Sequence, residues 1–237
     1  MNIVGLQKMT LLDYPGKVAC TVFLGGCNFR CPFCQNKDLL DGKAEPWITE
    51  AEFLHFLEKR RGLLDAVCIS GGEPTMQRDL IELARKIKDM GYLVKLDTNG
   101  SNPALLKELV GAGVLDYVAM DVKNCPRHYG ETTGVPGISL ERIEESIRFL
   151  MSDAVDYEFR TTVAEQLHSV QDMQEMGQWL QSLSSCQTKA KRLFIQPYRD
   201  SEGVLCPGLS APEKEKLQDF CQKLQPYVEN VNIRGID

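Results

Sequence analysis

The chain has 237 residues, a length that suits one α/β barrel of roughly 200–250 residues or one to two smaller domains. Its residues are 43% hydrophobic and 25% charged, which excludes a disordered or fibrous protein. The net charge of −6 argues against a broad nucleic-acid-binding surface and against an anionic membrane surface.

Two further patterns bear on location. No apolar run approaches the roughly 18 residues of a membrane-spanning helix, and residues 1–10 lack a signal-peptide pattern. We therefore expect a cytoplasmic protein that contacts neither membrane nor nucleic acid. In that compartment, nine cysteines indicate metal or redox chemistry rather than disulfides.

Strands and helices are predicted to alternate along the chain. Asn2–Lys8 and Val18–Leu24 flank the turn Asp13–Gly16 and predict a hairpin. Thr49 and Glu52 form a capping box that begins a helix ending near residue 60. Further strands are predicted at residues 66–70, 93–97, 117–121, 157–162, 193–196 and 231–234. Apolar residues at helical spacing predict helices at residues 80–90, 104–110, 140–151, 173–180 and 217–224.

Six successive strand-then-helix units require parallel strands joined by right-handed crossovers. The sequence therefore predicts an α/β fold: a single domain over residues 1–237, forming a partial (βα)6 TIM-like barrel with an N-terminal hairpin. Ligands bind such folds at the C-terminal ends of the strands. Polar or glycine-rich segments lie at the ends of the predicted strands, at Gly25–Cys27, Gly71–Pro74, Asp97–Gly100, Asp121–Lys123 and Gln196–Arg199, and the strand at residues 157–162 carries Arg160.

Cys27, Cys31 and Cys34 lie within eight residues, in a loop at residues 25–36. Thiolates at this density select zinc or iron–sulfur. A structural zinc site needs four protein ligands, and no fourth cysteine or histidine follows at ligand spacing. Clusters that only transfer electrons also use four cysteines. Three ligands therefore favour one 4Fe–4S cluster with an open iron, over a partial zinc site or free thiols.

This C-x3-C-x2-C loop, with Phe33 before its last cysteine, resembles the radical S-adenosylmethionine (SAM) superfamily. The glycine-rich segment Gly71–Pro74 strengthens the resemblance. It implies that the open iron chelates SAM, and that reductive cleavage of SAM releases a 5′-deoxyadenosyl radical.

Three other segments, residues 70–74, 97–100 and 120–123, are similar to the activating enzymes of glycyl radical enzymes. Residues 11–17, 157–162 and 195–199 resemble the anaerobic ribonucleoside-triphosphate reductase activating proteins. The resemblance implies an anaerobic oxidoreductase whose partner is a glycyl radical enzyme, the anaerobic ribonucleoside-triphosphate reductase. The oxidoreductase would remove a hydrogen atom from a glycine of this partner. The resemblance also implies a reducing flavodoxin or ferredoxin.

The resemblance further implies roles for individual residues. Cys27, Cys31 and Cys34 would hold the cluster, and no catalytic group beyond cluster and cofactor is expected. Phe33 and Gln35 would lie near the adenine. The glycine-rich turn with Gly71, Gly72 and Glu73 would receive the methionyl amino group, together with Asp97. The remaining cofactor contacts would be Asp121 near the ribose, Lys123 on the methionyl carboxylate, and Asn99, Arg160 and Arg199.

Structural roles remain open for several of these residues. Asp97 and Asp121 could cap helices, Lys123 could be a surface charge, and Arg160 could pair with Glu158 or another acid. The carboxylate of Glu73 could orient an ammonium or stabilise its turn. Two other functions also remain: a radical SAM enzyme acting on a small molecule such as a pterin-derived base, and a non-catalytic iron–sulfur electron carrier.

Overall fold

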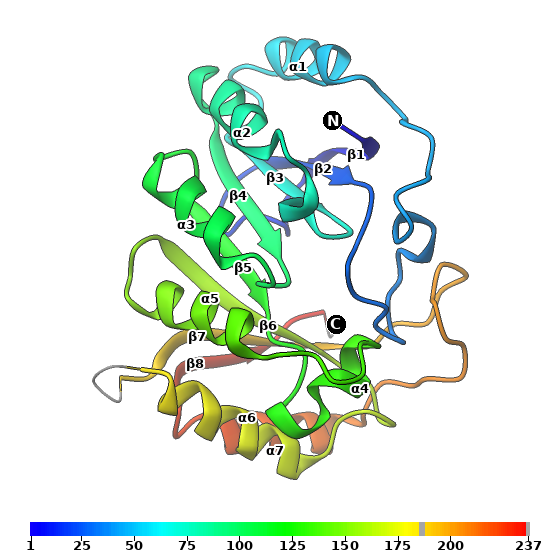
Figure 1. The fold of residues 1–237 in the computed structure, drawn as a ribbon, viewed down its shortest axis with the longest axis vertical. Coiled ribbons are helices and arrows are strands. Elements are labelled where there is room, and N and C mark those ends of the chain that lie inside the picture. The colour runs from blue at the N-terminus through cyan, green and yellow to red at the C-terminus, as the bar shows by residue number, and fades with distance from the viewer. Residues whose placement is uncertain (185–187, 236–237) are drawn as a thin grey trace. The chain divides into compact units, whose positions relative to one another are not determined.

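The computed structural model describes residues 1–184 and 188–235, and Figure 1 shows its helices and strands. The strands are β1 (Ile3–Thr10), β2 (Ala19–Leu24), β3 (Ala66–Gly71), β4 (Leu93–Thr98), β5 (Tyr117–Asp121), β6 (Asp156–Val163), β7 (Ala190–Pro197) and β8 (Val228–Ile233). The α-helices are α1 (Glu50–Lys59), α2 (Leu80–Asp89), α3 (Pro103–Gly111), α4 (Tyr129–Thr133), α5 (Glu141–Met151), α6 (Val170–Ser182) and α7 (Lys214–Leu224).

The strands form one sheet in chain order, from β1 to β8. β1 pairs antiparallel with β2, which confirms the predicted hairpin. The pairs β2–β3, β3–β4, β6–β7 and β7–β8 are parallel. Each strand from β2 to β7 is followed by at least one helix. The (βα)6 topology of a partial TIM-like barrel is therefore confirmed.

The chain packs as two compact units. Unit 1 contains Met1–Asn28, Asp38–Thr98 and Ala104–Ala119. Part of its core is a cluster of Tyr14, Ala19, Ala66, Cys68 and Tyr117, in which the two tyrosine rings lie 5.7 Å apart. Cys20 and Cys68 are fully buried, as small core residues in apolar strands are expected to be.

Unit 2 contains Phe29–Lys37, Asn99–Pro103 and the described residues from Met120 onward. Its helices α6 and α7 lie side by side (Figure 1). The α6 helix begins with a capping box between Ser169 and Asp172. The short helix α4 was not predicted; its left-handed cap, Gly134, ends it after five residues. Within the described residues, no helix is both long and apolar enough to span a bilayer.

Candidate functional site

In unit 1, the glycine turn after β3 packs against the backbone that leads into the first cysteine. Gly72 donates its N–H to the Leu24 carbonyl at 2.9 Å, and Glu73 donates to the Gly26 carbonyl at 2.8 Å. A Cβ on Gly72 would lie 2.1 Å from the Gly26 oxygen, and Gly71 has a φ of +127°. Both positions therefore require glycine for backbone packing beside Cys27.

The Glu73 side chain is buried and stabilises this turn. Its Oε1 accepts hydrogen bonds from the Thr75 N–H at 3.1 Å, the Thr75 hydroxyl at 2.5 Å and the Thr98 hydroxyl at 2.8 Å. The carboxylate thus ties the turn to the end of β4. The sequence left two roles open for this carboxylate, orienting an ammonium or stabilising its turn. The hydrogen bonds observed here are those of the second role.

Asp97, at the end of β4, has a partner that is not among the predicted site residues. Lys95 lies two residues earlier on the same face of the strand, and its ammonium is 2.5 Å from Asp97 Oδ1. Lys95 is only 1% exposed. In the sequence, Lys95 stands within the apolar run of a predicted strand. This position could have indicated an ion pair, because a lysine is rarely buried without a partner.

In unit 2, the loop with Cys31 and Cys34 is held by main-chain hydrogen bonds. Cys34 donates its N–H to the Cys31 carbonyl at 2.9 Å. The segment after β7 covers this loop: Leu205 donates to the Cys34 carbonyl at 2.9 Å, and Cys206 donates to the Pro32 carbonyl at 3.0 Å. Nothing in the sequence signalled this pairing, because it joins main-chain groups far apart in the chain.

Phe33, the aromatic residue of the cysteine loop, is buried between two side chains of the same unit. The Lys123 ammonium lies 5.8 Å from the centre of its ring, and the His168 ring lies 6.2 Å away. His168 Nδ1 accepts from the Ala164 N–H at 3.1 Å, so its Nε2 carries the proton and donates to the Lys123 carbonyl at 3.0 Å. His168 thus contacts both the ring of Phe33 and the main chain of Lys123.

The Asp121 carboxylate joins the two predicted cations of unit 2. Lys123 Nζ lies 2.9 Å from Oδ2, and Arg160 Nε lies 2.9 Å from Oδ1. Burial alone would lower the pKa of Lys123, but Asp121 and Cys31 raise it above its ordinary value. Lys123 is therefore a half-buried, charged ammonium rather than a freely exposed surface charge. Arg160 pairs with this other acid, since Glu158 pairs with Arg234.

Three predicted residues make local or peripheral contacts in unit 2. Asn99 Oδ1 accepts from the Ser101 N–H at 3.0 Å, which forms a tight turn. Gln35 donates from Nε2 to the Arg199 carbonyl at 2.7 Å, and the Arg199 guanidinium donates to the Gly235 carbonyl at 2.5 Å.

The predicted site residues are therefore divided between the units. Unit 1 holds Cys27, Gly71, Gly72, Glu73 and Asp97. Unit 2 holds Cys31, Phe33, Cys34, Gln35, Asn99, Asp121, Lys123, Arg160 and Arg199. Within unit 2, Lys123 lies over Phe33 and pairs with Asp121, and Asp121 also pairs with Arg160.

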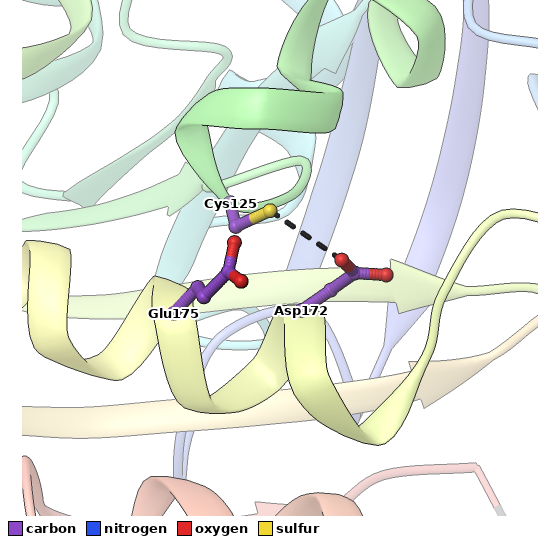
Figure 2. Close-up of side chains that lie close together, drawn as sticks. All are labelled: Cys125, Asp172 and Glu175. Atoms are coloured by element: carbon purple, nitrogen blue, oxygen red, sulfur yellow. Dashed lines mark hydrogen bonds between the residues drawn. The ribbon is translucent and has the colours of Figure 1, made fainter.

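A second group of potential metal ligands lies elsewhere in unit 2. The Cys125 thiol donates to Asp172 Oδ1 at 3.6 Å, and Glu175 lies beside them (Figure 2). The Arg127 guanidinium lies 3.8 Å from Asp172 and 3.7 Å from Glu175. Burial raises the pKa of Cys125 to about 11, which opposes thiolate formation. The hydrogen bond and the ion pairs account for Cys125, Asp172 and Glu175 without a metal ion, so we interpret this group as structural.

The chain belongs to the radical SAM superfamily, whose family model matches residues 21–163. It is 32% identical to the "Putative glycyl-radical enzyme activating enzyme" of Methanocaldococcus jannaschii, over 99% of this chain and 96% of that protein. It is also 30% identical to the 7-carboxy-7-deazaguanine synthase of Methanospirillum hungatei, over 60% of this chain and 58% of that protein.

Solved structures share the fold. SuiB of Streptococcus suis, bound to its precursor peptide SuiA, matches with a TM-score of 0.69 at 16% identity, over 91% of this chain and 48% of SuiB. A domain of the pyruvate-formate lyase-activating enzyme of Bacteroides vulgatus matches with a TM-score of 0.55 at 21% identity, over 72% of this chain and 99% of that domain. At these identities the likeness concerns the fold alone.

Proposed function

We propose that this radical SAM enzyme is an activase of a glycyl radical enzyme, and that its partner is the anaerobic ribonucleoside-triphosphate reductase. The observation that carries the proposal is a similarity, spanning nearly the whole chain, to a relative named for that activity. The reductase as partner rests on the resemblance of residues 11–17, 157–162 and 195–199.

The residues of the chain fit a cluster and SAM. Cys27, Cys31 and Cys34 are the cluster ligands in this proposal, and the family implies the 4Fe–4S cluster itself. One structural observation supports the fit. The hydroxyl of Tyr129 is buried in unit 2 and lacks a hydrogen-bond partner among the described residues, as expected of a group that faces a bound cofactor.

Cluster and SAM, when bound, would supply a one-electron reductive cleavage of the S–C5′ bond, with reduced flavodoxin or ferredoxin as the electron donor, the partner's glycine as the hydrogen donor, and methionine and 5′-deoxyadenosine as the products. The side chains of this protein bind and orient. Lys123 pairs with the methionyl carboxylate, and Asp121 orients Lys123 and Arg160. Phe33 provides an apolar surface beside the adenine.

The decisive experiment is anaerobic incubation of the reduced protein with SAM and the candidate reductase. We expect a glycyl radical signal on the reductase by electron paramagnetic resonance, with one 5′-deoxyadenosine formed per radical. A reductase in which the glycine is replaced by alanine is the matched control and should give no signal.

Two outcomes would contradict the proposal. Turnover of a free metabolite, with no radical on any partner, would favour the small-molecule enzyme, the class to which the deazaguanine synthase relative belongs by name. Redox cycling of the cluster without cleavage of SAM would favour an electron carrier.

A further inference from the structure

The segment of residues 199–206, which follows β7 and is orange in Figure 1, runs alongside the cysteine loop in unit 2. We call this segment the clasp. Its main-chain N–H groups at Leu205 and Cys206 donate to the carbonyls of Cys34 and Pro32, at 2.9 and 3.0 Å. A predicted cluster ligand, Cys34, is therefore itself one of the residues that the clasp contacts.

The contact continues beyond the last cysteine of the loop. Lys37 donates its N–H to the Gly203 carbonyl at 3.2 Å and its ammonium to the Glu202 carbonyl at 2.6 Å. The side chain of Val204, between these residues and Leu205, is buried. The clasp is therefore packed onto unit 2 and fastened to the loop on both sides of Cys34.

Gln35 lies at the centre of this contact. Its side-chain Nε2 donates to the Arg199 carbonyl at 2.7 Å. Its own carbonyl oxygen lies so close to Gly203 that a Cβ on that glycine would be 2.4 Å away. The side chain of Gln35 thus holds the start of the clasp, and its main chain leaves room only for glycine at position 203.

The cysteine loop depends on such contacts because it has no regular structure of its own. Residues 29–36 contain no helix or strand. A segment of this kind loses conformational entropy when it binds a metal group, and the loss is smaller when the segment is already ordered. Contacts with the clasp should therefore strengthen the binding of a cluster by Cys31 and Cys34.

We propose that the clasp retains the cluster by holding residues 32–37 in the conformation that presents Cys31 and Cys34 as ligands, and that Gln35 is a positioning residue of this contact. The inference rests on the proposed role of these cysteines as cluster ligands. It gives Gln35 a function through the main chain of the clasp, in addition to any contact with the cofactor.

The principal test is Gly203→Ala, because the new Cβ would press on the Gln35 carbonyl oxygen and push the clasp away. The proteins are loaded with cluster anaerobically, and the readout is the rate at which an excess of an iron chelator removes the iron. Overpacking of this kind should speed the release of iron about 5- to 150-fold.

Gly177→Ala is the matched control. Its Cβ would also meet a close neighbour in unit 2, the Tyr227 ring at 2.3 Å, but away from the clasp. It should release iron as wild type does, even if its urea midpoint falls. Equal acceleration in both variants would assign the effect to a general loss of stability and overturn the inference.

A second variant, Gln35→Met, covers the case in which Gly203→Ala takes up no cluster. It removes one exposed hydrogen bond, so we expect iron release to speed up about two- to threefold, with the SAM affinity of the loaded protein unchanged. Gln166→Met is the control, since Gln166 is also exposed but donates to Ser210, beyond the clasp. Weaker SAM binding with wild-type iron release would make Gln35 a cofactor contact alone and overturn its positioning role.

Hydrogen–deuterium exchange of the cluster-free proteins tests the clasp without any cluster. The amides of Leu205 and Cys206 should exchange faster in Gly203→Ala than in wild type or Gly177→Ala, because they would lose their acceptors in the loop. Faster exchange combined with wild-type iron release would show that the clasp does not retain the cluster. Failure of the wild type to bind a cluster would instead overturn the proposed function.

Discussion

Arg160 and Asp121 form an ion pair between neighbouring strands, with Arg160 Nε 2.9 Å from Asp121 Oδ1. Lys123 engages the other oxygen of the same carboxylate. One acidic side chain therefore fixes two cations, and one of them, Lys123, lies over the ring of Phe33 in the cysteine loop. Two contributions to SAM binding can therefore be tested by separate substitutions: the charge of Lys123, and the positioning of that charge by Asp121.

Lys123→Ala should weaken SAM binding and leave the cluster intact. A charge-assisted contact contributes on the order of 1.5–3 kcal/mol, so we expect about a 10- to 150-fold loss of affinity. Calorimetry measures the affinity, and iron and sulfide analysis measures the cluster.

Lys191→Ala is the matched control, because Lys191 pairs with Asp153 on the surface of the same unit. It should bind SAM as wild type does. Wild-type affinity in Lys123→Ala would remove this lysine from the cofactor site, and loss of iron would give it a role in the cluster or the fold.

Asp121→Ala should reduce stability as well as SAM affinity, because it leaves both Lys123 and Arg160 without this carboxylate. We expect the free energy of unfolding to fall by about 1–3 kcal/mol, since the pair is only partly buried. Urea unfolding of the cluster-free protein measures this change. The double variant Asp121→Ala, Arg160→Ala should lose less than the sum of the single changes, and strict additivity would show that the pair is not coupled.

Much of this arrangement could be predicted from the sequence. Alternating β-branched runs and amphipathic segments indicated each strand and every helix but α4, because both periodicities are local properties. The capping box of Thr49 and Glu52 placed the start of α1, and both of its hydrogen bonds are present. The family could be identified because the three cysteines lie within eight residues and the glycine turn follows directly on a predicted strand, so both motifs are local in the sequence.

Contacts between distant segments could not be predicted. Glu158 lies on the same strand as Arg160, two residues earlier, and is its natural partner in the sequence. The structure instead gives Glu158 to Arg234, at the end of the chain, and Asp121 to Arg160. The α4 helix escaped prediction because five residues are too few to display helical periodicity. The helix also holds the cysteine loop through a tertiary contact, the hydrogen bond from the Arg30 N–H to the Thr133 carbonyl, which local periodicity cannot reveal.

Gly72→Ala should destabilise the protein, because the new Cβ would lie 2.1 Å from the Gly26 carbonyl oxygen. That contact cannot be relieved by a flexible side chain, so we expect a loss of about 3 kcal/mol in the free energy of unfolding. Gly111→Ala is the control. Its Cβ would meet nothing within 4 Å, and helix propensity should make it neutral or stabilising. Equal stability of the two variants would contradict the packing argument.

Thiol reactivity should separate the cysteines by their burial. Burial raises the pKa of Cys20 to about 12, so at pH 8 its thiolate fraction is on the order of 0.01%. Cys206 is exposed. Brief treatment of the folded, cluster-free protein with iodoacetamide should therefore label Cys206 and spare Cys20, as peptide mass spectrometry would show. Labelling of Cys20 without unfolding would contradict its placement in the core.

The same pKa shift implies a pH dependence of stability. A thiol whose pKa is raised in the folded state contributes stability that is complete below its unfolded pKa of about 9. That contribution is lost as the pH rises toward 12. We expect urea midpoints of the cluster-free protein to fall from pH 9 upward, and to fall less steeply in Cys20→Ala. An equal slope in the two proteins would assign the alkaline loss to other groups.

Replacing any one of Cys27, Cys31 or Cys34 with alanine should abolish the 4Fe–4S cluster and the cleavage of SAM. A cluster with an open iron has three protein ligands, so the loss of one leaves too few to hold it. Anaerobic reconstitution followed by iron, sulfide and 5′-deoxyadenosine analysis measures both effects. Cys206→Ala and Cys125→Ala are the controls, since Cys206 is exposed and the Cys125 thiol is engaged by Asp172. Both should retain wild-type iron. If either control lost about half of its iron, the protein would hold a second cluster, and three ligands would not account for its metal.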